Sequence, residues 1–190
     1  MSAQVERASA ASGPGPTVLI VMGVSGSGKT TIGTLLAMRL HWEFEDADWF
    51  HPPANIEKMH NGIPLTDEDR LPWLKAIAAW IDRSRQEGHH GVIACSALKR
   101  SYRDILIGNR PDVSLVYLKG DEALIARRVA TRHEHFMPPS LLHSQFAALE
   151  EPTPDEKPIV VSVAPPPREI VANILSALNK DKTLELRRPA

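Results

Sequence analysis

A short segment near the start of the chain has the residue types and spacing needed to bind the phosphate groups of a nucleotide. It reads Gly23-Val24-Ser25-Gly26-Ser27-Gly28-Lys29-Thr30 and fits the pattern G-x-x-x-x-G-K-[ST] at every fixed position. Glycines let successive N–H groups of such a loop point inward around an anion. Lys29 is expected to reach the β- and γ-phosphates, and the Thr30 hydroxyl to bind Mg²⁺. A chance Gly/Ser turn is the alternative, but a buried strand before the loop and an amphipathic helix after it favour ATP binding. The expected ATP-binding residues are those of the loop and the next residue, Thr31.

Two acidic residues follow the next apolar segment and are candidates for metal binding and acid–base chemistry. Asp46 and Asp48 are two apart at the end of a short strand expected at 43–47, so both side chains should face the same side. The strand expected at 91–95 ends in Cys-Ser and lacks the usual Walker B aspartate. Asp46 is therefore the candidate to hold Mg²⁺ with Thr30, and Asp48 to orient an acceptor hydroxyl and take its proton. A solvated acidic loop remains the alternative.

The elements that must position these residues alternate along the chain. Strands are expected at 17–22, 43–47, 91–95, 114–118 and 158–163, and helices at 30–40, 73–85, 99–107, 121–131, 140–149 and 168–179. This alternation predicts an α/β fold with a five-stranded parallel sheet flanked by helices. We expect a single domain at 17–180 with a mostly helical insertion at about 50–88. Residues 1–16 should form a disordered leader and residues 181–190 a flexible tail.

Composition narrows the class of protein. The chain has 190 residues, a formal net charge of -1 and 43% hydrophobic residues, as expected for one globular domain. The balanced charge argues against nucleic-acid binding by bulk positive charge. Its single cysteine forms no internal disulfide, and no apolar run approaches the length of a membrane span. With no signal-peptide pattern at the N-terminus, a cytoplasmic protein that binds neither nucleic acid nor membrane is expected.

Several short sequence blocks outside the phosphate loop occur in far fewer protein families than the loop itself does. They include Asp46-Ala47-Asp48-Trp49-Phe50-His51-Pro52, Asn55-Ile56-Glu57-Lys58-Met59, Cys95-Ser96-Ala97-Leu98-Lys99, His135-Phe136 and Gln145-Phe146. With these blocks the chain resembles the gluconokinases, a family of small P-loop kinases, over most of 17–179. The resemblance implies ATP-dependent phosphorylation of D-gluconate to 6-phosphogluconate, a fold like that of nucleoside monophosphate kinases, and a homodimer. Ala47 departs from the glycine that is usual in this family.

The resemblance also implies where the acceptor binds. It points to the insertion after Asp48 and to the loop after the third strand, so the substrate-binding candidates are Asp48, His51, Lys58, Arg70, Ser96, Lys99, Arg103 and His135. A sugar acid needs a cation for its carboxylate and polar groups for its hydroxyls. Arg103 and Arg70 are preferred because a guanidinium offers a planar fork, with Lys99 as the alternative. For His51 the alternative is a loop residue that caps a nearby helix.

A basic segment further along the chain is expected to close over the nucleotide. Arg128 and Arg132 are four residues apart and share a helix face. Arginines that close on a transferring phosphoryl group stabilise its charge and exclude water, and the resemblance places a lid at about 128–140. We expect Arg132 to be catalytic and Arg128 to bind ATP. A solvated basic helix face is the alternative.

Other functions share part of this pattern. A P-loop kinase of another small hydroxy acid, such as shikimate, would use the same acid pair. A P-loop module that uses ATP as a switch is a second alternative, although the insertion and the lid look suited to enclosing a small molecule. The thiol of Cys95 sits on an expected buried strand and should be packed and unreactive rather than nucleophilic.

Overall fold

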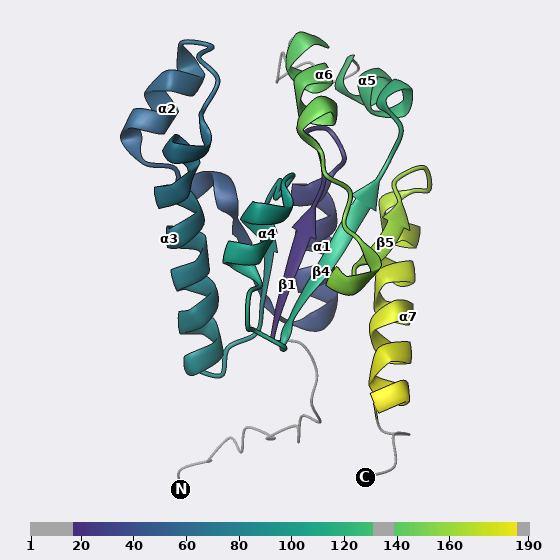
Figure 1. Ribbon diagram of the computed structural model, residues 1–190. Coiled ribbons are helices and arrows are strands. Elements are labelled where there is room, and N and C mark those ends of the chain that lie inside the picture. Colours follow the sequence, from purple (N-terminus) through teal and green to yellow (C-terminus); the bar gives the residue numbers. More distant parts are fainter. Residues whose placement is uncertain (1–16, 131–138, 186–190) are drawn as a thin grey trace, which may run out of the picture.

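The computed structural model describes residues 17–130 and 139–185, in which a five-stranded parallel sheet lies between two layers of helices (Figure 1). The strands are β1 (Val18–Met22), β2 (Glu43–Asp46), β3 (Gly91–Ala94), β4 (Val113–Lys119) and β5 (Ile159–Ser162). Their order is β2-β3-β1-β4-β5, and every pairing is parallel. The α/β fold and the parallel sheet predicted from the sequence are confirmed.

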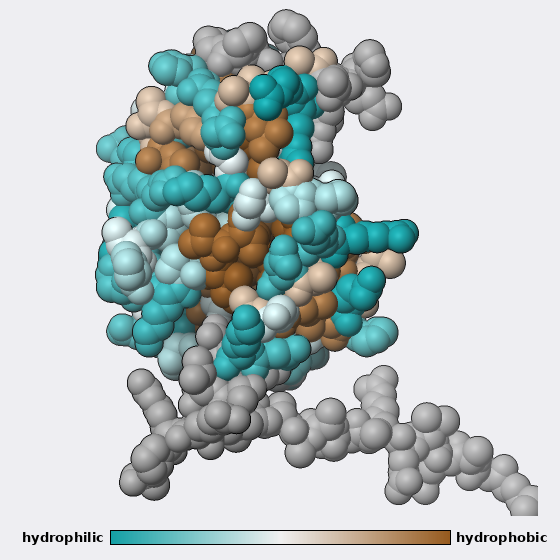
Figure 2. All heavy atoms as spheres, turned by 90° about the vertical axis from the view of Figure 1, so that its right-hand side faces the viewer, coloured by the Kyte–Doolittle hydropathy of each residue, from teal (hydrophilic) through white to brown (hydrophobic). Residues whose placement is uncertain are grey.

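The burial of each strand follows its place in the sheet. β1 is central, and its five apolar residues are fully buried, as expected for a strand covered on both faces. β5 lies at an edge and alternates, with Ile159 and Val161 buried and Val160 51% exposed. The side of the molecule that carries β5 and α7 accordingly shows apolar side chains between hydrophilic ones (Figure 2).

Helices cover both faces of the sheet. They are α1 (Lys29–Leu40), α2 (Pro53–His60), α3 (Asp67–Gln86), α4 (Arg100–Leu106), α5 (Glu122–Ala130), α6 (Pro139–Ala148) and α7 (Pro167–Glu185), with 3-10 turns η1 (Ala47–Phe50) and η2 (Pro154–Glu156). α1 and α7 pack in one core cluster, and α3 and α4 in a second cluster across the sheet. α2 stands on one side of the carboxyl ends of the strands, and α5 and α6 on the other (Figure 1). None of the described helices is long and apolar enough to cross a membrane.

Two helices differ from their predicted bounds. α3 begins at Asp67 rather than near Trp73, because Thr66 and Asp69 form a reciprocal capping box. Pro72 is the sixth residue of this helix and lies past the first turn, so it removes the backbone hydrogen bond to the Glu68 carbonyl without ending the helix. α7 continues to Glu185 rather than ending at 179, since no glycine or proline interrupts the sequence there. The first residues of the predicted flexible tail are therefore helical, whereas the predicted leader at 1–16 lies outside the described residues.

Candidate active site

The phosphate loop connects β1 to α1 at the carboxyl end of the sheet. Gly28 has φ +96° and precedes α1 without a side chain that could cap it. A helix start without such a cap is suited to binding an anion. Gly26 has φ +80°, and a Cβ there would lie 2.5 Å from a methyl carbon of Val129. The Lys29 ammonium donates to the Val24 carbonyl at 3.1 Å. The loop therefore has the curled backbone and the helix start that a phosphate chain requires.

The acid pair is joined to this loop by hydrogen bonds. The Thr30 hydroxyl donates to Oδ2 of Asp46 at 2.8 Å, and the Asp48 N–H donates to Oδ1 of Asp46 at 3.1 Å. Asp46 ends β2, whereas Asp48 lies in η1. The prediction that both acids share one side of a strand was therefore wrong. Asp46 instead caps the 3-10 turn that carries Asp48, and this cap keeps the two carboxylates together.

The surroundings of Asp48 disfavour its charged form. Asp48 is an exposed residue, yet the protein atoms around it desolvate the carboxylate enough to raise its pKa, and repulsion from Asp46 raises it further. The charges of Lys29 and His51 act in the opposite direction without cancelling the rise. Asp48 is thus a better proton acceptor than an ordinary surface aspartate.

His51 ends the 3-10 turn η1, where its backbone N–H donates to the Asp48 carbonyl at 3.4 Å, and its ring is held by aromatic stacking. Its ring lies against that of Trp73, with centroids 4.6 Å apart and planes 5° apart, and the Trp73 indole N–H donates to the Ala47 carbonyl at 2.7 Å. Partial burial lowers the pKa of His51, although Asp48 opposes this shift. The His51 Nδ1 is buried, and no described group forms a hydrogen bond with it. The core residue Trp73 therefore also fixes the turn that carries Asp48.

The loop after β3 lies between the phosphate loop and the acid pair, because β3 is placed between β1 and β2. The Gly23 N–H donates to the Ser96 carbonyl at 3.4 Å. Cys95 is 1% exposed, and burial raises the pKa of its thiol to about 12. Its predicted role as a packed thiol is confirmed, since a thiol in this state supplies almost no thiolate at neutral pH.

The basic candidates of the acceptor side gather around two acids of α3. Lys99 forms an ion pair with Asp67 at 2.7 Å, and the Tyr102 hydroxyl donates to the same carboxylate. Both contacts lower the pKa of Asp67. Lys58 pairs with Asp69 of the capping box at 2.7 Å. The start of α3 thus brings the insertion and the loop after β3 together.

Arg70 lies on the first turns of α3, and its guanidinium donates to the Leu65 carbonyl. Its charge acts on the pKa values of both His51 and Lys99. This places Arg70 close to the Asp48 turn and to the loop after β3 at once. Arg70 therefore lies within electrostatic reach of substrate candidates on both of these segments.

Arg103 requires a correction, because the structure gives it a structural position. The side chain is 1% exposed, and its guanidinium pairs with Glu156 at 2.5 Å. Its Nη1 also donates to the carbonyls of Ala97, Leu98 and Glu150, at 3.1, 3.1 and 3.0 Å. A guanidinium committed in this way cannot also bind a substrate carboxylate.

The predicted lid is described in part. Arg128 is in the last turn of α5 and donates to the Val163 carbonyl just after β5. Asp121 caps α5, since its carboxylate accepts from the Leu124 N–H at 2.7 Å. Arg132 and His135 lie outside the described residues, so their predicted roles stay predictions.

Sequence reasoning missed one contact to the phosphate loop. The Ser25 N–H donates to Oε1 of Gln145 at 2.6 Å. Gln145 lies on α6, far from the loop in sequence but beside it in the fold. The only sequence signal for it was its place in the Gln145-Phe146 block of the family resemblance.

A phosphate loop at the carboxyl end of a parallel sheet, with an acid pair beside it and a helical insertion after it, defines a P-loop kinase. The family model described as Shikimate kinase matches residues 25–179. A gluconokinase of Gluconobacter oxydans is 51% identical over 147 residues, which cover 77% of this chain and 83% of that protein. The thermoresistant gluconokinase of Escherichia coli is 41% identical over 87% of this chain and 95% of its own length. The chain belongs to the gluconokinase family of P-loop kinases.

Solved structures agree with this assignment. The crystal structure of a gluconokinase from Sinorhizobium meliloti superposes with a TM-score of 0.82 at 44% identity and covers 93% of this chain and 98% of its own. A shikimate kinase from Aquifex aeolicus has a TM-score of 0.56 at 18% identity and covers 87% of this chain and 98% of its own. The second likeness shows the fold alone.

Proposed function

We propose that this kinase transfers the γ-phosphate of ATP to D-gluconate and forms 6-phosphogluconate. The observation that carries the proposal is the chain of contacts from Thr30 through Asp46 to Asp48, which joins the phosphate loop to a carboxylate with a raised pKa. The acceptor is supported by the gluconokinase relatives, which are 41–51% identical in the bacterial sequences compared above. Shikimate is not favoured, because the shikimate kinase of Aquifex aeolicus is only 18% identical.

The donor side rests on the phosphate loop. Its amides and Lys29 would hold the β- and γ-phosphates, and the start of α1 would add positive potential. The oxygens of Thr30 and Asp46 lie 2.8 Å apart, and such hard donors fit Mg²⁺, whose remaining ligands are phosphate oxygens and water. Mg²⁺ bound there would neutralise charge on the phosphates. Arg128 and Arg132 are assigned to the nucleotide and to the transferring phosphoryl group.

Asp48 would act on the acceptor hydroxyl. As the hydroxyl oxygen forms its bond to the γ-phosphorus, the bond from that phosphorus to the β-γ bridging oxygen breaks, and ADP leaves. The hydroxyl proton passes to the carboxylate of Asp48. Lys29, whose charge opposes the rise in the pKa of Asp48, would also hold the phosphates close. This division of labour needs no covalent intermediate on the protein.

The remaining candidates would bind the acceptor. Arg70 and Lys99 supply cations for the carboxylate of gluconate, and His51 and Ser96 supply polar groups for its hydroxyls. Lys58 and His135 are kept as further substrate candidates, whereas Arg103 is no longer among them. The pairing of Lys99 with Asp67 would hold the ammonium ready at the edge of this site.

An assay of ADP release separates the candidate functions. We expect fast turnover with gluconate and ATP-Mg²⁺, and turnover at least about a hundredfold slower with shikimate, AMP or no acceptor, because groups built to bind one set of hydroxyls reject others strongly. Fast ADP release without an acceptor would favour the ATP-switch alternative. Fast turnover with shikimate alone would overturn the choice of acceptor.

Three expectations about location, binding partners and oligomeric state accompany this proposal. A cytoplasmic location and the absence of nucleic-acid or membrane partners follow from charge and composition, and the homodimer follows from the family resemblance. They stay predictions, and the solution mass of the purified protein checks the last of them.

A further inference from the structure

The most buried charged side chain of the described residues lies next to the acceptor site without being part of it. We propose that Arg103 is a positioning residue that holds the loop 95–99 in the conformation needed to bind the acceptor. The proposal rests on the proposed function, because it takes this loop as part of the gluconate site. Arg103 is 1% exposed, and its Nε and Nη2 are occupied by Glu156 at 2.5 and 3.0 Å.

The loop it holds has an unfavourable backbone. Ala97 has φ +43°, in the left-handed region that residues other than glycine seldom adopt. Nη1 of Arg103 binds the carbonyls of Ala97 and Leu98, both at 3.1 Å. The Glu150 N–H donates to the Leu98 carbonyl at 2.9 Å as well. Arg103 therefore stabilises the left-handed turn at Ala97, because without these hydrogen bonds the loop would relax to a more favourable backbone conformation.

The loop matters because each of its ends enters the site. At one end the Ser96 carbonyl accepts from the Gly23 N–H of the phosphate loop. At the other end Lys99 pairs with Asp67 at the start of α3. A shift of the turn at Ala97 would therefore move Ser96 and Lys99 relative to the phosphates. Misplacement of a binding group by about 1 Å can cost a hundredfold in rate.

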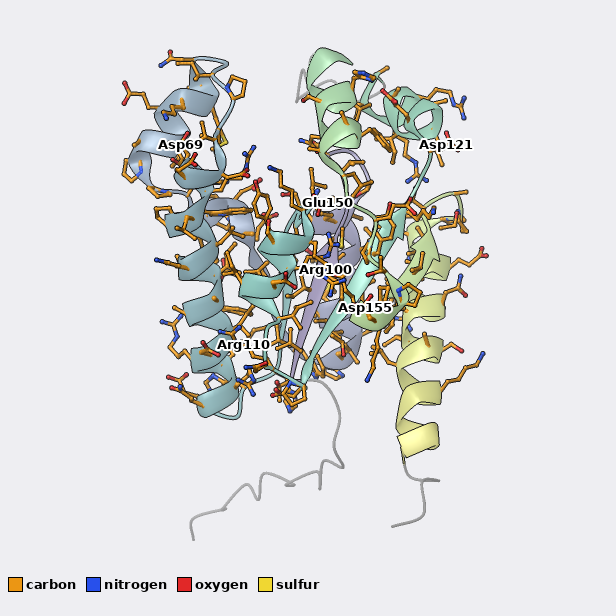
Figure 3. All side chains as sticks on the ribbon, viewed as in Figure 1. Asp69, Arg100, Arg110, Asp121, Glu150 and Asp155 are labelled. Carbon is orange, nitrogen blue, oxygen red and sulfur yellow. The ribbon has the colours of Figure 1, made fainter. Side chains whose placement is uncertain are left out.

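A segment after α6 anchors the arginine from the other side. The Glu150 carbonyl accepts from Nη1 of Arg103 at 3.0 Å, and the Glu150 carboxylate accepts from the Arg100 N–H at 2.6 Å. Arg100 also pairs with Asp155 at 2.7 Å. Figure 3 shows Arg100, Glu150 and Asp155 together at the front of the molecule, whereas Arg110 lies at the far end of the sheet.

Arg110 offers a matched control. It follows the same helix α4, and its guanidinium also forms a fork on a carboxylate, that of Asp82, at 2.6 Å through both Nε and Nη2. Its Nη1 likewise binds two carbonyls, those of Ile105 and Leu106, at 3.0 and 3.2 Å. The two arginines thus share their hydrogen-bonding pattern and differ in position and in burial, since the Arg110 side chain is 18% exposed.

The test compares Arg103→Lys with Arg110→Lys in the full chain. Lysine keeps the positive charge, but one nitrogen cannot serve a carboxylate and the loop carbonyls together. For Arg103→Lys we expect the KM for gluconate to rise about tenfold or more while the KM for ATP changes less than about twofold. Amide exchange at 96–99 should also become faster. For Arg110→Lys, both KM values and this exchange should match the wild type, even if the melting temperature falls.

Each other outcome overturns the proposal. Equal changes in the two variants would show a general loss of stability, and an unchanged KM for gluconate would show that the loop order is not used for the acceptor. A higher KM without faster exchange would mean that Arg103 acts by another route. The exchange measurement needs no substrate, so failure of the wild type to phosphorylate gluconate would refute the proposed function separately.

Discussion

Asp48 derives its chemistry from the groups around it rather than from its own residue type. A free aspartate has a pKa of 3.8, and desolvation by its neighbours followed by repulsion from Asp46 raises that of Asp48 above this value. Partial desolvation also lowers the pKa of His51 and so favours its uncharged form. A carboxylate that accepts a proton more readily therefore lies near an imidazole that loses one more readily.

The change Asp48→Asn should separate chemistry from nucleotide binding. Asparagine keeps the size of the side chain but cannot take a proton, so we expect kcat to fall by about 10²–10⁴ while the Kd for ATP stays within about twofold. In the wild type, the deprotonated carboxylate is the active form. Activity should therefore be lost as pH falls through the raised pKa of Asp48, at a pH above 3.8. Steady-state kinetics across pH check both points, and an unchanged kcat in the variant would exclude Asp48 as the base.

At the scale of elements, α3 links the core to the acceptor side. Its middle turns bury Trp73, Ile77 and Trp80 against the sheet, while its first turn presents Asp67 to Lys99 and Asp69 to Lys58. The capping box formed by Thr66 and Asp69 fixes where this helix begins. The position of the acceptor-side cations therefore depends on how well one helix start is held.

The change Thr66→Ala should weaken this start. The Thr66 hydroxyl accepts from the Asp69 N–H at 3.2 Å, and loss of such a cap costs about 1 kcal/mol of stability. We expect a lower denaturant midpoint with an unchanged m-value, and a modest rise in the KM for gluconate. Thr66→Ser keeps the hydroxyl and should restore both values. Identical unfolding curves for the alanine variant and the wild type would show that the cap contributes nothing.

At the scale of the whole molecule, ion pairs join segments that are far apart in the sequence. Glu156 of η2 meets Arg103 of α4, and Asp112, just before β4, meets Arg85 of α3 at 2.7 Å. Burial by itself would raise the pKa of Glu156, but the hydrogen bonds from Arg103 and from the Thr153 N–H outweigh it and lower the pKa. The folded protein therefore binds a proton at Glu156 less readily than the unfolded chain does.

This difference predicts how stability depends on pH. The contribution of Glu156 is fully present above its ordinary pKa of 4.5 and is lost as pH falls through the lower folded value. The melting temperature should therefore fall on acidification below 4.5, and Glu156→Gln should make this fall shallower because its side chain does not titrate. Calorimetric melting curves of both proteins between about pH 3 and 7 check the slopes. Parallel slopes would exclude Glu156 as a contributor.

The sequence could predict the features whose signals are local. The phosphate loop has fixed spacing, and the parallel sheet follows from apolar runs separated by amphipathic segments. The roles of Arg103 and Gln145 could not be predicted, because their partners are distant in sequence, 53 residues for Glu156 and 120 for Ser25. Arg100 is partly solvated, whereas Arg103 is buried and binds a carboxylate through two nitrogens. The sequence around a charged residue near a helix start does not distinguish these two cases. Asp48 could be predicted as a candidate because it is an acid that follows an apolar segment. Its placement depends on a 3-10 turn, which the alternation of a strand does not predict.

The buried thiol described above has a practical consequence. Cys95 is the only cysteine of the chain, and its burial and high pKa leave it almost inert toward maleimides at neutral pH. A second cysteine placed at an exposed position of α2, such as Glu57, could therefore carry a fluorophore without first removing the native one. Emission from that label would report any change in the surroundings of the insertion when ATP or gluconate is added.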